Sequence, residues 1–583
     1  MCRSLSSSMA PGPFPIPAVR SPDTTTRLVL WGAAACALIA WLMPTHELPW
    51  PAFHAEWAMA VAALVGTGGV LYALRGRIAT MPTLAAVALL VATTPLLQLS
   101  VGIVRFAGDA ILASLYLSSF AIMVIVGYHA ARLWSGCGVL VACAWAVFLA
   151  SLASSGMALC QWQAPDDLPA LVNQLAPNAR PYANLLQPNL LATLLVLGLV
   201  SVACLFDSRR MGAATSLLSF GLFSFGLVLT QSRAAWLELV VISLVVIAKR
   251  RVLTGRLRLR HLAVGALLLI VAQLAWTFLD PLGVQPVARD ASETALSTGN
   301  RITHWHEMAV AISRHPWLGY GWMGVVSAQY DVAVAFPATH EVMGYSHNLV
   351  VDLLVCTGIP LGLAITGWLL IWLWRVVVRA ADSTTLLAVA ALMAMLTHAQ
   401  VEYPLAYTYF LLPAGLLCGL LSRNSLPAAV RAVPNWMAPL LLACASATLV
   451  VVSIDYLEVE QQIRLARFDQ ARIGLDRPRP AASPIRVLTQ LDALLRFGRT
   501  PERMNLTPSQ LDEMRDVVVR FPSGSNMVSF AAALAMNQRP EEAAQVLQRV
   551  CKFEREAGCQ SMKNRWAVLS RKQAAIQQVA WPP

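Results

Sequence analysis

Five short polar segments of the sequence carry arginine or histidine side chains between long apolar stretches. They are Arg180-Pro181-Tyr182-Ala183-Asn184 with Gln187-Pro188-Asn189, Thr230-Gln231-Ser232-Arg233, Gly299-Asn300-Arg301 with Trp305, Tyr345-Ser346-His347-Asn348, and His398 with Glu402-Tyr403-Pro404. Arginine presents a permanently charged, planar guanidinium group that matches the oxygen atoms of a phosphate ester. Histidine has an unperturbed pKa of about 6.5 and can accept a hydroxyl proton near neutral pH. Together these side chains suit group transfer from a phosphate ester.

The composition indicates that the elements that position these residues lie in a membrane. Of the 583 residues, 57% are hydrophobic and 13% are charged, and the mean hydropathy is +0.60. An ordinary soluble domain has about 25% charged residues. The same figures exclude a disordered chain, a collagenous repeat and a small disulfide scaffold.

A membrane-spanning helix needs about 20 mostly apolar residues, and this length predicts an all-α, polytopic membrane protein with about thirteen spans. The predicted spans are roughly 27–43, 57–74, 83–101, 110–128, 137–155, 190–206, 212–230, 234–248, 261–279, 349–378, 384–400, 404–421 and 437–455. The first residues do not have the pattern of a cleaved signal peptide, so we expect none to be removed.

The basic residues predict the orientation of the chain. With a cytoplasmic N-terminus, eighteen Lys and Arg residues fall in cytoplasmic segments and six in external loops. Cytoplasmic loops are enriched in Lys and Arg, so this orientation is expected, with the C-terminal region on the opposite side. The formal net charge of +12 then reflects topology, and we expect no nucleic-acid partner.

The predicted organisation has three parts. Residues 1–26 are expected to form a disordered cytoplasmic arm, and residues 27–455 a transmembrane domain that includes an external loop over 280–348. Residues 456–583 are expected to form an external helical domain. Within it, 526–553 reads as two helices in the manner of a tetratricopeptide hairpin; a helical domain of no special type is the alternative.

Two cysteines of this external domain, Cys551 and Cys559, lie where a disulfide is chemically possible. On a continuous helix they would be about 12 Å apart, too far for a disulfide. Pairing therefore requires a break in the helix before Gly558, and both outcomes remain open.

All five polar segments fall on the external side of the predicted topology. Polar side chains at this position, against the orientation bias, are functional candidates and suit a phosphate ester anchored in the lipid bilayer. The simpler interpretation is that the arginines reach the headgroups, His347 caps a helix, and Tyr403 and Trp305 belong to the aromatic belt. The order and shared side of the segments favour a functional site.

No metal or cofactor site is predicted. The external carboxylates form no group with the ligand spacing of a metal site, and His304 and His306 point apart because they flank Trp305 on a helix. A P-loop, a dinucleotide fingerprint and a hydrolase elbow are missing from the sequence. The energy of the reaction is therefore expected to enter with the substrate.

These segments resemble motifs of the O-antigen ligase and polymerase (WaaL/Wzy) superfamily over about 40–455. The shared motifs are Arg180 with Gln187-Pro188-Asn189, Gln231-Ser232-Arg233, Arg301 with Trp305, His315-Pro316-Trp317-Leu318-Gly319-Tyr320-Gly321, and Ser346-His347-Asn348. Two more segments and the helical tail are similar to the bacterial protein O-oligosaccharyltransferases of the PglL type. These two segments are Pro44-Thr45-His46-Glu47-Leu48-Pro49-Trp50 with Phe53 and Glu56, and Glu402-Tyr403-Pro404-Leu405 with Tyr409-Phe410.

The resemblance implies an enzyme of the bacterial inner membrane that moves a glycan in one block from undecaprenyl pyrophosphate to Ser or Thr of an exported protein, such as a pilin. In this family the histidine that matches His347 activates the acceptor, and arginines that match Arg233 and Arg301 hold the pyrophosphate. Positions that match Gln187 and Tyr403 are associated with the donor. The other substrate-site candidates are Arg180, Asn189, Trp305, Asn348 and Glu402.

Elementary chemistry leads to the same roles. Pyrophosphate is a good leaving group when its developing charge is met, as Arg233 and Arg301 can do in a partly dry periplasmic cleft. His347 can take the proton of the acceptor hydroxyl. Attack opposite the leaving group would invert the anomeric centre, without a metal.

Two alternatives remain open at this stage. One is a ligase or polymerase that uses a carbohydrate acceptor. The other is a transporter of lipid-linked glycans, although such proteins often show internal repeats and place their site at mid-membrane. Glu238 and Asp352 lie inside predicted spans, as supporting partners of the arginines or as residues that face the bundle interior.

Overall fold

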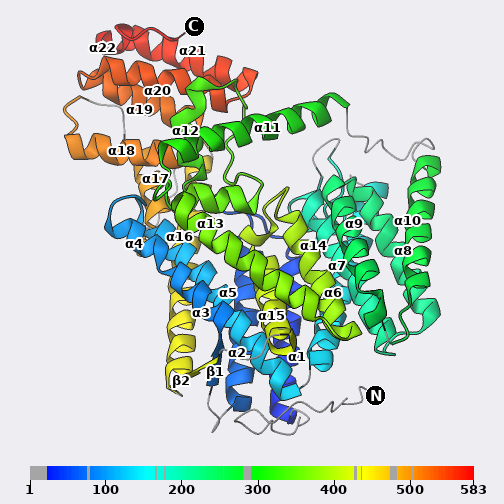
Figure 1. The fold of residues 1–583 in the computed structure, drawn as a ribbon. Coiled ribbons are helices and arrows are strands. Elements are labelled where there is room, and N and C mark those ends of the chain that lie inside the picture. Colours follow the sequence, from blue (N-terminus) through cyan, green and yellow to red (C-terminus); the bar gives the residue numbers. More distant parts are fainter. Residues whose placement is uncertain are drawn as a thin grey trace. The chain divides into compact units, whose positions relative to one another are not determined.

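The computed structural model is helical apart from one short strand pair among its described residues, and this confirms the all-α fold class (Figure 1). The structure describes residues 23–74, 79–134, 136–164, 167–175, 179–253, 255–279, 291–425, 430–434, 436–472, 482–500 and 504–582. The chain divides into two compact units. The first unit comprises 1–91, 116–289 and 370–449, and the second comprises 92–115, 290–369 and 450–583.

The first unit is built mostly from apolar helices. Its elements are α1 (Thr24–Leu42), α2 (Phe53–Leu74), β1 (Ala79–Pro82), α3 (Thr83–Ala92), α6 (Gly136–Gln163), α7 (Pro188–Asp207), α8 (Ala213–Thr230), α9 (Arg233–Ala248), η1 (Arg250–Val252), α10 (Leu259–Leu279), α14 (Ser383–His398), η4 (Pro404–Ala406), α15 (Thr408–Ser425) and β2 (Val430–Val433). The residues of α5 (Ala107–Trp134), α13 (Leu349–Arg379) and α16 (Met437–Gln470) are divided between the units. Strands β1 and β2 pair antiparallel.

The second unit contains shorter helices and the C-terminal domain. Its further elements are α4 (Thr94–Ser100), α11 (Ala291–Arg314), α12 (Val325–Val332), η3 (Ala333–Ala335), α17 (Thr489–Arg499), α18 (Pro508–Arg520), α19 (Gly524–Met536), α20 (Pro540–Phe553), α21 (Glu556–Lys572) and α22 (Ala574–Gln577). Helix α1 already begins at Thr24, inside the predicted arm of 1–26, while residues 1–22 lie outside the described residues. Residues 280–290 of the predicted external loop lie outside them too.

Each predicted span corresponds to a helix of the structure. Among the described residues, ten helices are long and apolar enough to cross a membrane, the Thr83–Ser100 stretch of α3 and α4 counting as one. The spans predicted at 234–248, 384–400 and 404–421 correspond to α9, α14 and α15, which are not among these ten. The protein is therefore a multi-pass membrane protein, and the number of thirteen spans stays a prediction.

Helix α7 lies at the centre of the first unit. It packs against α6, α8 and α14, and its side chains Leu191, Leu194 and Leu195 are fully buried. A Cβ atom at Gly198 would lie 2.5 Å from the Ser151 hydroxyl oxygen of α6. The glycine therefore allows the close approach that small residues give to neighbouring membrane helices.

The C-terminal helices α18 to α21 stack one on another in Figure 1. Helix α19 packs against α20 across a short turn, so 526–553 contains the two predicted helices, and their tetratricopeptide type stays a prediction. Helix α20 ends at Phe553 and α21 begins at Glu556. This break precedes Gly558 and brings the Cα atoms of Cys551 and Cys559 to 5.0 Å, where the two residues form a disulfide.

The turn that follows α11 packs against α13 at a break in that helix. Gly358 of α13 has a φ of +77°, and the Ile359 N–H donates to the Pro316 carbonyl oxygen at 2.7 Å. A Cβ atom at Gly358 would lie 2.4 Å from the Trp317 carbonyl oxygen. The glycine thus provides both the left-handed backbone and the space that the 315–321 motif needs.

Candidate catalytic site

The His347 backbone adopts an uncommon conformation directly before α13. Its φ is +62°, in the left-handed region that residues other than glycine seldom occupy. The following residue, Asn348, accepts hydrogen bonds through Oδ1 from the backbone N–H groups of Val350 at 3.0 Å and Val351 at 3.1 Å. Asn348 therefore caps the helix, and the chain must turn sharply at His347 to place this cap.

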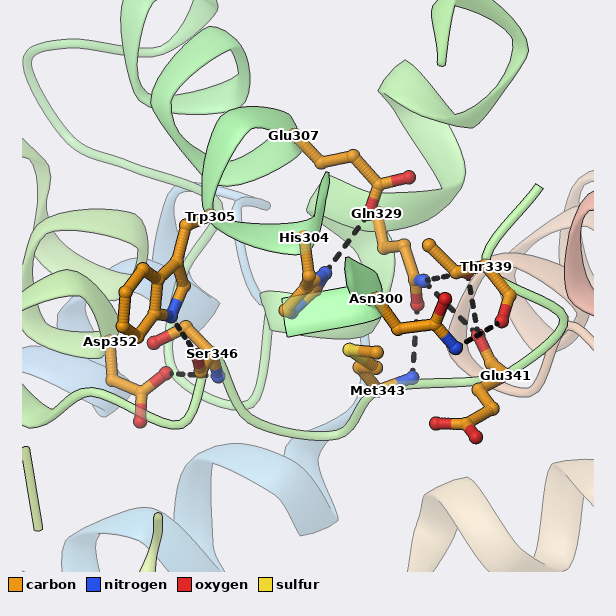
Figure 2. Close-up of polar contacts among 10 residues, drawn as sticks. All are labelled: Asn300, His304, Trp305, Glu307, Gln329, Thr339, Glu341, Met343, Ser346 and Asp352. Atoms are coloured by element: carbon orange, nitrogen blue, oxygen red, sulfur yellow. Dashed lines mark hydrogen bonds and ion pairs between the residues drawn. The ribbon is translucent and has the colours of Figure 1, made fainter. Parts of the chain in front are cut away.

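Both backbone groups of Ser346 are held by neighbouring helices (Figure 2). The Ser346 N–H donates to Asp352 Oδ1 of α13 at 2.7 Å. The indole N–H of Trp305, on α11, donates to the Ser346 carbonyl oxygen at 2.8 Å. Left-handed backbone at a non-glycine residue costs about 1–2 kcal/mol and persists only where the surroundings hold it. These two hydrogen bonds hold the peptide next to His347.

One side of α11 holds the segment that leads to His347. The Asn300 side-chain amide donates to the Thr339 carbonyl oxygen at 3.0 Å. His304 Nδ1 lies 3.0 Å from Glu307 Oε2, and both side chains are buried. Asn300 and His304 are four residues apart and lie on one face of α11, whereas Trp305 points in another direction, toward Ser346 (Figure 2).

The electrostatic surroundings of His347 include Arg301, another of the predicted site residues. The pKa of His347 is lowered to about 3, chiefly by burial and in addition by the nearby Arg301 and His304. The imidazole is therefore neutral near pH 7 and can accept a proton. The second unit thus brings together four predicted site residues, namely Arg301, Trp305, His347 and Asn348.

The other predicted arginines lie in the first unit. Arg233 is the first residue of α9. The Arg180 guanidinium donates to the carbonyl oxygens of Thr230 at 2.9 Å and Gln231 at 3.4 Å, next to the Gln231-Ser232-Arg233 motif. The structure therefore brings the Arg180 and Arg233 segments together, while the meeting of Arg233 with Arg301 and His347 stays a prediction.

Four other predicted residues form two hydrogen-bonded pairs at the start of α7. Gln187 Nε2 donates to the Tyr403 hydroxyl oxygen at 2.7 Å. Asn189 Nδ2 donates to Glu402 Oε1 at 2.8 Å. These pairs join the segment before α7 to the turn after α14, which lie far apart in the sequence. The four side chains therefore form a compact polar group at the start of α7 and the end of α14.

Sequence reasoning missed Thr193, which lies one helical turn after Asn189. Its hydroxyl donates to Glu238 Oε1 at 2.7 Å and lies 2.6 Å from His398 Nδ1. All three side chains are buried. A threonine in an apolar span is unremarkable by itself; the available signal was its i+4 spacing from Asn189. His398 is the last residue of α14.

A third polar group surrounds Glu56, in the first turn of α2. The Trp50 indole N–H donates to Glu56 Oε1 at 3.1 Å, and the Tyr116 hydroxyl donates to the same carboxylate. The Thr408 hydroxyl donates to the Glu56 carbonyl oxygen at 3.1 Å. The Trp50 contact joins the segment that follows α1 to the first turn of α2. In the described ranges, no group of His, Cys, Asp or Glu side chains is placed to hold a metal ion.

Trp305→Phe is expected to lower the catalytic rate about 3- to 10-fold, because it removes a hydrogen bond of about 0.5–1.5 kcal/mol and leaves the Ser346 carbonyl oxygen unpaired. The rate constant of group transfer at saturating substrates measures the effect, with little change expected in KM. Trp317→Phe is the matched control, since this side chain is 75% exposed. Equal rates for both variants would contradict a positioning role of Trp305.

Tyr403→Phe is expected to raise the KM for the lipid-linked substrate about 5- to 10-fold, because Gln187 then lacks the acceptor of its 2.7 Å hydrogen bond. Initial rates against the concentration of this substrate measure the change. Tyr72→Phe, on the more exposed α2 surface, is the control and should behave as wild type. An unchanged KM in Tyr403→Phe would remove this pair from the substrate site.

Comparison with known proteins adds two family matches. Residues 218–366 match a family model described as O-antigen ligase. Residues 386–559 match one described as the C-terminal part of a virulence factor membrane-bound polymerase. The first match contains Arg233, Arg301 and His347.

Two relatives from Acinetobacter baylyi are similar to the chain. A general O-oligosaccharyltransferase is 28% identical over 531 residues, which cover 89% of this chain and 91% of the relative. A ComP-specific O-oligosaccharyltransferase is 30% identical over 252 residues, which cover 43% of this chain and 45% of that relative. The first similarity extends over both the membrane helices and the C-terminal helices.

Proposed function

The chain belongs to the O-antigen ligase superfamily as a glycosyltransferase of the PglL type, and from this we propose that it transfers a glycan from undecaprenyl pyrophosphate to exported proteins. The glycan moves in one block to a Ser or Thr hydroxyl. The observation that carries this proposal is the placement of Arg301 near a half-buried, neutral His347. The transport alternative finds no support, since both relatives are named as transferases.

His347 acts as the general base in the proposed reaction. It takes the proton of the acceptor hydroxyl while the hydroxyl oxygen attacks the anomeric carbon. The bond between this carbon and the pyrophosphate oxygen breaks, and its electron pair leaves with the pyrophosphate. Attack from the side opposite the leaving group inverts the anomeric centre.

Arg301 and Arg233 stabilise the leaving pyrophosphate in this scheme. A guanidinium group pairs with two phosphate oxygens at once, and its positive charge acts strongly in a site that excludes water. The bound anion also offsets the positive charge that Arg301 exerts on His347. Donor binding therefore raises the pKa of His347 and makes it a better base when the substrate is present.

The polar pairs of the first unit bind the donor in this proposal. Gln187 with Tyr403 and Asn189 with Glu402 offer amide and hydroxyl groups, and Arg180 adds a guanidinium group. Asn348 keeps His347 in place through the helix cap. The scheme assigns no step to a metal or another cofactor.

The experiment that tests the function is a reconstitution with purified protein. An undecaprenyl-pyrophosphate-linked glycan is supplied with an exported protein, or with lipid A core as a carbohydrate acceptor, in the presence and absence of a chelator. We expect mass spectrometry to find the intact glycan on Ser or Thr, unaffected by the chelator. Transfer to the carbohydrate alone would make the protein an O-antigen ligase, and transfer to neither would refute the proposal.

We also propose an inner-membrane location with a cytoplasmic N-terminus and a periplasmic site and C-terminal domain over 456–583. The disulfide between Cys551 and Cys559 supports this side, since disulfides persist in the periplasm and are rare in the cytosol. In whole cells both thiols should resist alkylation until a reductant is added, and Cys559→Ser should expose Cys551. Direct alkylation of both cysteines in the wild type would place the domain in the cytoplasm.

A further inference from the structure

The second unit contains a cavity of about 410 Å³ that has no part in the reaction described above. Pockets of about 300–1,000 Å³ commonly hold ligands. The residues around it come from the segment after α4, from 315–331, and from α18 and α20. Those that matter most are Arg105, Tyr320, Ser327, Tyr330, Arg520 and Arg549.

Hydrogen bonds of Gln98 fix the 318–322 segment, part of which lines the cavity. The Gln98 side-chain amide donates to the carbonyl oxygens of Leu318 at 3.1 Å and Cys356 at 2.9 Å. Its Oε1 accepts from the Trp322 N–H at 3.1 Å. A Cβ atom at Gly321 would lie 2.8 Å from the Val104 side chain, so the two lining segments pack tightly. The cavity is therefore a preformed feature.

Most charged side chains around the cavity are paired with an opposite charge. Arg520 makes hydrogen bonds to both carboxylate oxygens of Asp109, at 2.9 and 3.1 Å. Arg105 pairs with Asp516, and Asp331 pairs with Arg314 at 3.0 Å. Arg549 instead donates to the carbonyl oxygens of Tyr330 at 2.9 Å and Gln545 at 2.7 Å. A pyrophosphate needs several cationic groups that are not neutralised by carboxylates, so this cavity suits a ligand with little net charge.

Two of the aromatic rings around the cavity, those of Tyr330 and Tyr320, pack against neighbouring side chains. The Arg549 guanidinium lies 4.8 Å from the ring centroid of Tyr330, and the Phe553 ring stacks with that of Tyr330 at a centroid distance of 6.3 Å. The His315 and Tyr320 rings make an edge contact, with their centroids 4.5 Å apart. This packing leaves these two rings less open face on which a sugar could stack. A polypeptide, with apolar side chains and backbone amides, fits this lining better.

The cavity adjoins the segment that carries His347. Helix α12 lines the cavity through Ser327 and Tyr330. Its Gln329 side chain donates to the Glu341 carbonyl oxygen at 3.1 Å and accepts from the Met343 N–H at 3.0 Å, in the segment that leads to His347. A polypeptide in the cavity could therefore extend from the C-terminal helices toward the proposed general base.

We propose that this cavity binds an extended segment of the acceptor protein, next to the hydroxyl that receives the glycan. The proposal rests on the proposed function, because it assumes that the acceptor is a protein. The C-terminal helices α18 and α20 then take part in acceptor choice, since Arg520 and Arg549 form part of the wall.

Ser327→Trp tests the proposal by filling the cavity from α12. The full-length enzyme is given the lipid-linked glycan and a synthetic peptide that spans the serine or threonine glycosylated by the wild type. The matched control is Ser313→Trp, on the exposed surface of α11. We expect Ser327→Trp to raise the KM for the peptide about 10-fold or more, a change of about 1.4 kcal/mol. The KM for the donor and the rate at saturating peptide should stay at the wild-type values.

An unchanged peptide KM in folded Ser327→Trp would overturn the proposal, and so would an equal rise in the donor KM. A second measurement covers the case in which this variant does not fold. Benzoylphenylalanine at position 327 should crosslink the same peptide on irradiation, whereas the same group at position 313 should not. No crosslink at 327, or equal crosslinks at both, would also overturn it. If the wild type glycosylates no protein, the proposed function fails instead.

Discussion

Replacement of His347 by alanine is expected to lower the rate of glycan transfer about 10²- to 10⁴-fold, the usual contribution of a general base. The variant leaves the acceptor hydroxyl without a group to take its proton. Binding of the donor should change little, because the proposed pyrophosphate contacts come from arginines. Single-turnover transfer to an acceptor peptide, with donor and peptide both saturating, measures the effect.

The matched control for this variant is His306→Ala, which removes an exposed histidine from α11. It should keep the wild-type rate. Size-exclusion profiles in detergent establish that both variants fold. A folded His347→Ala enzyme with half or more of the wild-type rate would end the proposed role of this histidine.

The lowered pKa of His347, about 3 in the free protein, predicts an unusual pH dependence. A histidine with an ordinary pKa of about 6.5 would lose its base function on acidification from about pH 8 to pH 5. His347 stays neutral over this interval, so its protonation should not reduce kcat/KM there. A decline that follows a single pKa near 6.5, and that disappears in a variant of another histidine, would assign the base elsewhere.

The lowered pKa of His347 also makes the stability of the folded protein depend on pH. The unfolded chain binds a proton at His347 below about pH 6.5, and the folded protein does not. Protonation therefore favours unfolding, and the folded state loses stability as the pH falls below this value. Thermal unfolding should show a smaller loss on acidification in His347→Ala than in the wild type.

Arg301→Ala is expected to lower kcat about 10²- to 10³-fold, the range found when one donor to a developing negative charge is removed. Arg301→Lys should recover only part of the loss, because an ammonium group lacks the planar fork that pairs with two phosphate oxygens. Transfer rates at saturating donor and acceptor measure both variants. Arg571→Ala, at an exposed position of α21, is the control.

Arg301 has a second expected effect, on His347. Its positive charge is one cause of the low His347 pKa, so Arg301→Ala should raise this pKa while burial still keeps it below its ordinary value. A shift of the acidic limb of the pH–rate profile to higher pH measures this coupling. The double variant with His347→Ala should lose less than the product of the two single losses, since the residues act as one unit. Strictly multiplicative losses would show that they act apart.

The helices were the most predictable part of this protein. A run of about 20 apolar residues has few other solutions in a bilayer, because every backbone N–H and C=O must be satisfied within the segment. The two helices at 526–553 were equally predictable, since Pro540 is a residue type that favours the first position of a helix and starts α20. Helix-forming patterns are local, and local patterns are visible in the sequence.

The site was predictable as a set of residue types and only partly as an arrangement. Sequence reasoning selected Arg301, Trp305 and His347, and the structure places them in one unit. It could not show that Trp305 holds the Ser346 carbonyl oxygen, because the two residues come from different elements. Thr193 was missed because its role arises only when α9 and α14 bring Glu238 and His398 to α7.

The amino-acid sequence alone determined the membrane location of the chain, its helices and the residue types available for chemistry. This was possible because each apolar segment enters the bilayer according to its own length and composition. Tertiary structure alone decided the Cys551–Cys559 disulfide, the left-handed backbone at His347, the low pKa of its imidazole and the cavity near Arg520. Each of these depends on burial or on contacts made by the packed helices, and no local sequence pattern specifies such contacts.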